Sequence, residues 1–363
     1  MSVASPAGSD EIAELNAIGT WTAYLDLSYP ANFNSGEPHP WRSKLTTNRL
    51  SQFSPNMGMI YFRREASEAS PFGLEIGAQG GYDTDGQVPA TSQLAGAEVL
   101  RYLSHANVSY RAPVGNGLLL TGGLMSSFIG YESFYARDNP NYTRSWIADY
   151  SPFFLIGAGA QYRISDGLDA SLFIVSDFDY LAHHNNHPKY AGQISWRIGP
   201  GWKLTQNVFA GPEQTDTAIR YWRFFSDSIL QWTDDVHAIG LAYDVGTQQE
   251  ASLVASVQNF WTGAALFTRW QIQGPWALAI RPELYWDPNG TLTGSIQFIR
   301  ALTATVEYAI VADGWTTQLR AEYRYDNSTG RQGGFFGAGG TDGPLVSGQS
   351  TVLLAVLISL DRP

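Results

Sequence analysis

Between residues 276 and 325, side-chain character alternates with a period of two, and this alternation restricts the fold more than any other feature. In the first stretch, apolar Trp276, Leu278, Ile280, Pro282, Leu284 and Trp286 alternate with Ala277, Ala279, Arg281, Glu283 and Tyr285. In the second, Trp315, Thr317, Leu319, Ala321, Tyr323 and Tyr325 alternate with Thr316, Gln318, Arg320, Glu322 and Arg324. Because successive side chains on a strand point to opposite faces, each stretch predicts a strand with one apolar and one charged face. A soluble sandwich would bury the apolar face, whereas a membrane barrel turns it outward and lines water with the charges.

The same pattern recurs along the 363-residue chain and predicts sixteen strands. They are residues 20–29, 56–64, 71–80, 101–111, 117–126, 152–163, 168–176, 189–198, 202–210, 219–232, 237–245, 259–271, 275–286, 296–310, 315–325 and 350–360. Alternate connections are short and contain Gly, Pro, Asp or Ser, which tight turns require, and the connections between them are long. This layout predicts an all-β fold: a single closed antiparallel transmembrane β-barrel with short periplasmic turns and long extracellular loops. We expect residues 1–18 to form a polar tail or short helix, and residues 19–363 to form the barrel.

Composition excludes several classes of protein. The longest wholly apolar run, residues 352–358, is far shorter than the roughly 20 residues of a membrane helix. A net charge of −11 argues against nucleic acid as a partner.

Tryptophans cluster beside the predicted short turns, at Trp202, Trp232, Trp270, Trp276 and Trp315. This clustering is typical of the aromatic girdle at a membrane interface, and Tyr285, Trp286, Tyr323 and Tyr325 would lie at or near the opposite girdle.

Charged residues on the strands fall almost entirely on the face predicted to point inward. The candidate pore-lining residues are Glu75, Arg111, Arg163, Arg223, Arg269, Arg281, Glu283, Glu307, Arg320, Glu322 and Arg324. Charges are costly in lipid and cheap in a water-filled lumen, so this distribution supports the barrel. Several of these side chains could instead stiffen the wall by pairing across strands. Arg300 alone shares the outward parity, which a bulge or an interfacial position would explain.

The third long loop, residues 127–151, is the candidate constriction of the lumen. It contains Tyr131, Glu132, Tyr135, Arg137, Asp138, Tyr142, Arg144 and Asp149. Opposite charges across a narrow pore would orient polar solutes, and aromatic rings would offer a surface to sugars. The competing interpretation is that these residues only attach the loop to itself or to the wall.

Histidines invite two other hypotheses. The cluster at residues 183–187 contains three histidines, which could bind zinc or copper, but His, Asn and Pro are ordinary loop residues and we expect no metal and no cofactor. A barrel lipase would need a paired Ser and His on its outer face, whereas His105 has inward parity. We therefore expect no enzymatic activity.

The residues resemble those of a known family, the OmpL-like outer-membrane porins, also called β-barrel porin type two. The resemblance covers about residues 20–360 and depends on the order and spacing of YRAPVGNG at 110–117, IGYE at 129–132, NYTRS at 141–145, FAGPE at 209–213, DPNG at 287–290 and LRAEYRYD at 319–326. It implies a pore in the bacterial outer membrane for small hydrophilic solutes, surrounded by lipid and lipopolysaccharide. By analogy, such a barrel could form a homotrimer.

Two alternatives to a passive diffusion channel stay open at this point. One is a structural or scaffold barrel that is sealed by its loops or filled by a partner protein. The other is a soluble all-β carbohydrate-binding protein, which would need no detergent.

Overall fold

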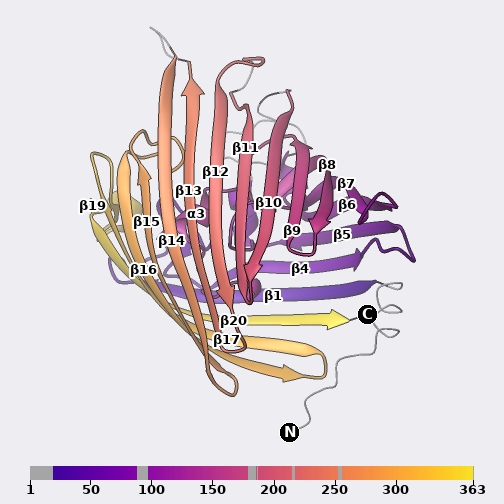
Figure 1. Cartoon of the computed structure of the whole chain (residues 1–363). Coiled ribbons are helices and arrows are strands. Elements are labelled where there is room, and N and C mark those ends of the chain that lie inside the picture. Colours follow the sequence, from indigo (N-terminus) through magenta and orange to yellow (C-terminus); the bar gives the residue numbers. More distant parts are fainter. Residues whose placement is uncertain are drawn as a thin grey trace.

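A computed structural model describes residues 19–87, 97–178, 185, 187–214, 217–251 and 256–362. Residues 1–18, and most of the histidine cluster at 183–187, lie outside this range. In the part that is described, sixteen strands close into one antiparallel barrel, with neighbours in chain order and the last strand paired to the first (Figure 1). The predicted fold class and strand number are confirmed.

The barrel strands carry the labels of Figure 1. They are β1 (Thr20–Asn32), β4 (Ser54–Arg64), β5 (Phe72–Gly80), β6 (Leu103–Ala112), β7 (Leu118–Ser126), β8 (Phe154–Ser165), β9 (Leu168–Val175), β10 (Lys189–Gly199), β11 (Trp202–Pro212), β12 (Trp222–Thr233), β13 (His237–Glu250), β14 (Val257–Gln273), β15 (Trp276–Asp287), β16 (Gln297–Ala312), β17 (Trp315–Thr329) and β20 (Gly348–Arg362). The first and last strands start and end at the rim of the short turns (Figure 1).

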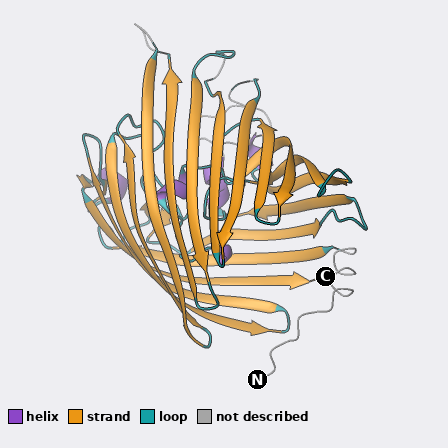
Figure 2. Ribbon diagram, in the orientation of Figure 1, coloured by secondary structure: helices purple, strands orange, loops and turns teal. Residues whose placement is uncertain are grey.

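The long connections contain the remaining elements, and Figure 2 shows short helices within the barrel wall. They are the strand pairs β2 (His39–Pro40) with β3 (Arg49–Leu50) and β18 (Phe335–Phe336) with β19 (Leu345–Val346), and the short helices η1 (Tyr82–Gln87), α2 (Ala97–Leu100), η2 (Ala136–Asp138), α3 (Trp146–Asp149) and η3 (Gly340–Asp342). Among the described residues, no helix is long and apolar enough to cross a membrane.

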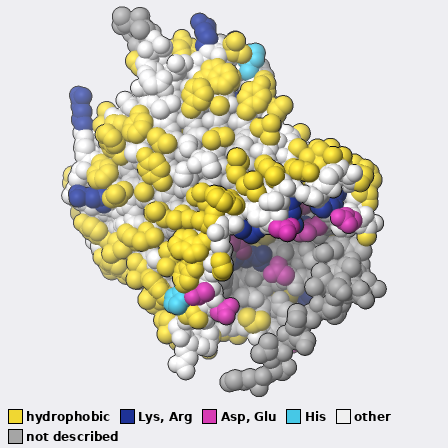
Figure 3. All heavy atoms as spheres, in the orientation of Figure 1, with side chains coloured by type: hydrophobic (Ala, Val, Ile, Leu, Met, Phe, Trp, Pro, Cys, Tyr) yellow, Lys and Arg dark blue, Asp and Glu magenta, His cyan; other side chains and the backbone are white. Residues whose placement is uncertain are grey.

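The apolar faces of the strands point outward, as the alternation predicts. On β15, Leu284 and Trp286 are 48% and 45% exposed, whereas Arg281 on the same strand is fully buried. Figure 3 shows apolar side chains spread over the outer wall, with charged side chains gathered around a hollow at the rim where the chain ends. A soluble globular core would have the opposite arrangement, so that alternative is excluded.

Aromatic residues mark the two ends of the apolar band. Trp202, Trp276 and Trp315 are exposed beside short turns, and Trp202 lies opposite Trp232 across β11 and β12. At the other end, the exposed aromatics include Trp286, Tyr323 and Tyr325. Tyr285 lies next to this girdle but is 1% exposed and faces inward, because its odd position on β15 points into the barrel.

Arg300 points outward without a bulge. The pairing of β16 with β15 and β17 is continuous through Arg300, which lies opposite Leu284 and Asn327. Its guanidinium donates a hydrogen bond of 3.0 Å to the Asn327 side chain and lies over the Phe298 ring. Because these residues are close to the long-loop rim, the charge stays near water while its stem covers apolar surface.

Candidate functional site in the lumen

Residues 127–151, here called the inner loop, fold into the barrel between two unlike parts of its inner wall. Most of the loop is buried, including α3, whose Trp146 has no exposed surface. Ser145 caps α3 by accepting a hydrogen bond from the Ala148 N–H, which satisfies one of the free donors at the start of the helix. The loop therefore has a defined conformation inside the lumen.

One part of the wall, on β15–β17, is ionic. Arg281 pairs with Glu283 at 3.2 Å, and Arg324 pairs with the same carboxylate at 3.1 Å. Closer to the short turns, Arg320 pairs with Glu307 at 2.7 Å. All five side chains are almost completely buried, and charges in such a position are stable only when paired and hydrogen-bonded.

The inner loop completes this lattice. Glu132 accepts a hydrogen bond of 2.9 Å from Arg281, and Glu322 accepts from the backbone N–H groups of Tyr142 and Thr143. The Trp146 N–H donates to Glu283. Backbone donors of the loop thus occupy carboxylate oxygens that no arginine reaches, so the loop and the wall satisfy each other.

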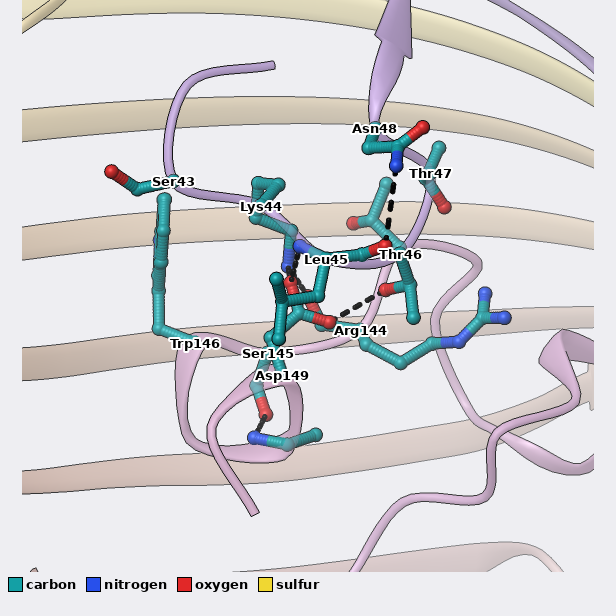
Figure 4. Close-up of polar contacts among 12 residues, drawn as sticks. Ser43, Lys44, Leu45, Thr46, Thr47, Asn48, Arg144, Ser145, Trp146 and Asp149 are labelled. Atoms are coloured by element: carbon teal, nitrogen blue, oxygen red, sulfur yellow. Dashed lines mark hydrogen bonds and ion pairs between the residues drawn. The ribbon is translucent and has the colours of Figure 1, made fainter. Parts of the chain in front are cut away.

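A second connection, residues 33–53, called the first loop, closes over the inner loop from the long-loop side. Figure 4 shows Lys44 and Thr46 reaching Asp149, with a Lys44–Asp149 ion pair of 2.5 Å and a Thr46 hydrogen bond of 2.6 Å. Lys44 also donates to the Arg144 carbonyl oxygen. Burial lowers the pKa of the Lys44 ammonium, although the Asp149 carboxylate beside it acts in the opposite direction. Since both side chains are fully buried, each depends on the other for its charge.

A further ion pair attaches the inner loop to η1. Arg144 bonds Asp83 at 2.7 Å, and both are fully buried. Burial raises the pKa of the Asp83 carboxyl, against the opposing effect of Arg144. Three separate segments of the long-loop side therefore meet at Arg144 and Asp149.

The opposite part of the wall, on β9–β14, carries a cluster of apolar side chains on its inner face. Its buried residues include Phe173, Phe209, Phe225, Ile229, Trp261 and Phe267, which pack with Ile129, Trp146 and Ile147 of the inner loop. Tyr131 stacks on Phe267 with ring centroids 4.2 Å apart. At the level of the inner loop, the loop and these side chains therefore form a dry core that fills this part of the lumen.

Two glycines on this wall make room for the inner loop. A Cβ at Gly240 would lie 2.5 Å from the Tyr131 ring, and one at Gly263 would lie 2.5 Å from Ile147. Any side chain at either position would displace the loop or its own strand, so the glycines allow the loop to approach the backbone closely.

Below the inner loop, towards the short turns, the lumen holds two cavities. The first, about 420 Å³, lies against β4–β9 and has a polar side with Glu75, Asn107 and Thr121 and an apolar side with Phe128 and Phe173. The second, about 390 Å³, lies against β12–β17 and is lined by Tyr131, Arg137, Asp138, Arg269 and Glu307, among others. Both cavities therefore lie between the inner loop and the short turns, and both have charged residues in their walls.

The structure divides the candidate residues into groups. Of the constriction candidates, Tyr131, Arg137 and Asp138 face the second cavity, whereas Glu132, Tyr135, Tyr142, Arg144 and Asp149 are buried and bonded to neighbouring segments. Of the pore-lining candidates, Arg281, Glu283, Glu307, Arg320, Glu322 and Arg324 meet at the ionic wall, and Arg269 joins them through a 3.0 Å pair with Glu307.

The other pore-lining candidates lie apart from this group. Glu75 lines the first cavity, and Arg111 and Arg163 are near short turns, where Arg163 pairs with Asp169 at 3.2 Å. Arg223 lies within the apolar wall, over the rings of Phe178 and Trp261.

His105 forms a 2.9 Å hydrogen bond with Ser126 beside the first cavity. A nucleophilic serine needs its histidine to be oriented by a third group, usually through Nδ1. Among the described residues, Nδ1 of His105 is buried without a hydrogen-bond partner, and the ring lies 4.4 Å from the Tyr61 ring. The pair therefore lacks the third member of a catalytic triad.

Sequence reasoning missed Lys44, Asp83 and the apolar inner wall. Phe225, Ile229, Trp261 and Phe267 occupy inward-facing positions on β12 and β14. Apolar residues at these positions were a signal that another part of the chain packs against this wall and excludes water. No local pattern marks Lys44 or Asp83, because each finds its partner on a distant loop.

A wide barrel with an apolar exterior, a charged interior and an infolded loop defines an outer-membrane porin. The chain belongs to the family described as "Putative beta-barrel porin-2, OmpL-like", whose model matches residues 19–360. It is thus an integral protein of the bacterial outer membrane and a porin, which confirms the predicted family, function and location. Family and fold are those of a channel.

Solved structures with the same fold are remote in sequence, and no curated protein sequence matches. An anion-selective porin from Comamonas acidovorans is 9% identical with a TM-score of 0.59, covering 94% of this chain and 99% of that one. The outer membrane channel DcaP of Acinetobacter baumannii is 7% identical with a TM-score of 0.56, covering 95% and 98%. The trimer form of OmpT from Vibrio cholerae is 9% identical with a TM-score of 0.56, covering 94% and 98%.

Proposed function

We propose that small hydrophilic solutes cross this porin by passive diffusion past the edge of the inner loop, through the second cavity. The proposal depends on the residues that line this cavity. Tyr131, Arg137 and Asp138 of the inner loop face Arg269 and Glu307 of the wall across it. Both signs of charge line one space of about 390 Å³, so a polar solute of either charge, or none, finds a partner there.

Conductance in planar bilayers tests the proposal. We expect ohmic current steps from the folded protein, and larger steps from Tyr131→Ala, because removing the ring widens the second cavity. Arg163→Ala, which changes an exposed pair beside a short turn, should leave the steps unchanged. Equal steps from Tyr131→Ala and the parent would show that solutes take another path.

A sealed scaffold barrel is the second candidate, and burial of the first and inner loops favours it. In that function, the dry core and the ion pairs at Arg144 and Asp149 would close the lumen permanently. If protein that is shown to be folded by its heat-modifiable mobility in electrophoresis carries no current, the result would support the scaffold over the channel.

We also propose that the barrel forms a homotrimer through the outer face of β5–β9. These strands are 9, 10, 9, 12 and 8 residues long, against 14 and 17 for β13 and β14, so this side of the barrel is lower. Gly122, Ala158 and Ala160 lie in an apolar groove between larger residues such as Leu120 and Leu172. Side chains of a second copy would fill this groove. The trimer form of the Vibrio OmpT gives a precedent in the same fold.

Native electrophoresis and cross-linking in detergent test the oligomer. Ala160→Trp should fill the groove and convert trimers to monomers, whereas Ala321→Trp on the far side of the barrel should not. Trimers that persist in Ala160→Trp would exclude this face.

We further infer that lipid surrounds the apolar band, that lipopolysaccharide contacts the rim of the long loops, and that the protein catalyses no reaction. Arg300, which points outward near that rim, offers a guanidinium to a lipopolysaccharide phosphate. The incomplete Ser126–His105 pair supports the absence of catalysis.

A further inference from the structure

Two carboxyl groups lie within the apolar part of the wall, under the tip of the inner loop. Asp227 on β12 and Asp244 on β13 are directly opposite each other in the strand register and are 0% and 3% exposed. Their inward neighbours along the strands, Phe225, Ile229 and Ala242, are buried and apolar. Acidic side chains are rarely buried in such surroundings without a partner.

The pair holds the loop through hydrogen bonds. Asp227 accepts from the Gly130 N–H at 2.8 Å and from the Asn207 side chain at 2.8 Å. Each of the two side chains also has a buried Oδ1 atom for which no donor is found among the described residues. Two carboxyl groups directly opposite each other in a buried site cannot both be ionised, so one of them keeps a proton, which it can donate to the other. The docked loop therefore covers a carboxyl pair that retains one proton.

Among the described residues that line the gap beside the pair, none carries a positive charge, and Arg281 behind them is bonded to Glu132 and Glu283. Besides the pair, the charged or titratable residues around the gap are Tyr131 and Glu132, and both Glu132 oxygens are occupied by Arg281 and the Ser145 N–H. The other neighbours are neutral: Asn207 on β11, and Gly263 and Phe267 on β14.

Arg223 and metal ions do not supply the charge either. Arg223 is further along β12, over the Phe178 and Trp261 rings. Among the described residues, no group of three acidic, His or Cys side chains could hold a metal ion.

We propose that the Asp227–Asp244 pair is a proton-dependent latch that docks the inner loop and opens the channel when it ionises. This inference rests on the proposed function as a channel. Two adjacent carboxylates cannot both stay ionised in a dry site, and the gap beside them is too narrow for a water molecule while the loop is docked. Hydration of the second charge therefore requires the loop tip at Gly130 to leave.

The direction of the pH dependence follows from where the proton is bound. The docked state retains a proton that the released state loses more easily, so docking is favoured at low pH. As the pH rises through the ionisation of the pair, the loop is released and conductance increases.

Two measurements on the full-length protein in bilayers or detergent test the latch between about pH 5 and about pH 10, which spans the documented ionisation of buried carboxyls. The first is single-channel conductance. The second is the rate at which a charged maleimide labels Ile129→Cys, a buried position next to Gly130 in a chain that has no cysteine of its own. Both should rise several-fold at alkaline pH.

The variant Asp244→Asn distinguishes the latch from other causes of a rise in conductance and labelling with pH. The amide donates permanently to Asp227, so the loop should stay docked, with low conductance and slow labelling throughout the range. Asp169→Asn is the matched control: this carboxylate pairs with Arg163 and Arg197 away from the loop, and the rise should persist.

Three results would overturn the proposal. They are a flat response of the parent protein, a rise that survives in Asp244→Asn, and a rise that calcium abolishes, which would indicate a bridging cation instead of a proton. Ohmic current without pH dependence would remove the latch and leave the channel. If no current appears at any pH, the channel proposal fails, and labelling of Ile129→Cys still decides whether the loop is released.

Discussion

Arg281 illustrates what single residues contribute to this barrel. Its parity on β15 predicts that it faces inward, but its partners come from distant parts of the chain: Glu132 and the Thr143 carbonyl of the inner loop, besides Glu283 on its own strand. A side chain that satisfies two carboxylates inside a dry interface is a structural connection first and a pore-lining group second.

Replacing Arg281 by Met should therefore destabilise the barrel. The substitution leaves Glu132 buried without its cation, and breaking a buried pair in this way costs about 3–5 kcal/mol. The measurement is the urea concentration at which the folded, heat-modifiable band disappears. Arg163→Met is the control, because that side chain is 60% exposed and its pair is worth at most about 1 kcal/mol. Equal losses in both variants would contradict the role given to Arg281.

Gly263 provides a second test at this scale. Gly263→Ala should cost about 1–3 kcal/mol, because the added Cβ would lie 2.5 Å from Ile147 and 2.7 Å from Tyr285 in a packed interface. Gly192→Ala is the matched control, with its nearest contacts at 3.5 Å. Thermal unfolding of the two variants should differ; if it does not, the inner loop is not held tightly against β14.

Among the elements, the strands were predictable and the long connections were not. Sixteen strands follow from alternation and turn residues, because both signals are local. The first and inner loops fold inward through Lys44, Asp83, Arg144 and Asp149, whose partners are far away in sequence. For the same reason, the sequence identified the inner loop as the candidate site but did not separate its buried residues from those that face a cavity.

The short turn between β12 and β13 should depend on pH in a defined window. Hydrogen bonds from the His237 ring and from the backbone N–H groups of Val236 and His237 lower the pKa of Asp234 to about 2. Because the pKa of Asp234 is lowered in the folded turn, the ionised carboxylate stabilises the turn above about pH 4. This stabilisation is lost as the pH falls towards about 2. Hydrogen–deuterium exchange, corrected for its intrinsic rate, should show protection of both amides decreasing in this window. Asp234→Ala should be unprotected at every pH.

For the whole molecule, the two aromatic girdles define the membrane-spanning height. Trp286 follows Trp276 by ten residue steps on β15. At about 3.4 Å per step and a tilt of about 40°, this distance spans about 26 Å of membrane, close to the apolar band of such barrels. Ile280 lies near the middle of this band, and Ile310 lies beyond Tyr308, which pairs with Trp276.

Depth should therefore decide the effect of a charge on the outer face. Ile280→Arg should cost about 2–4 kcal/mol of folding free energy, and Ile310→Arg about 1 kcal/mol or less, measured by folding titrations into lipid vesicles. If both substitutions cost the same, the band lies elsewhere on the wall. The natural Arg300, near the opposite rim, is consistent with the low cost at the interface.

By itself, the sequence determined the strand number, the antiparallel order, the outward apolar face and the family, because side-chain parity and turn chemistry are properties of neighbouring residues. Only the tertiary structure decided that the lumen is partly dry. Inward aromatic residues on β9–β14 look the same in sequence whether they face water or a loop, and the ion pairs that hold the loop join residues that are 61 to 149 positions apart. Packing across such distances depends on the closed barrel, which forms only when all sixteen strands are in register.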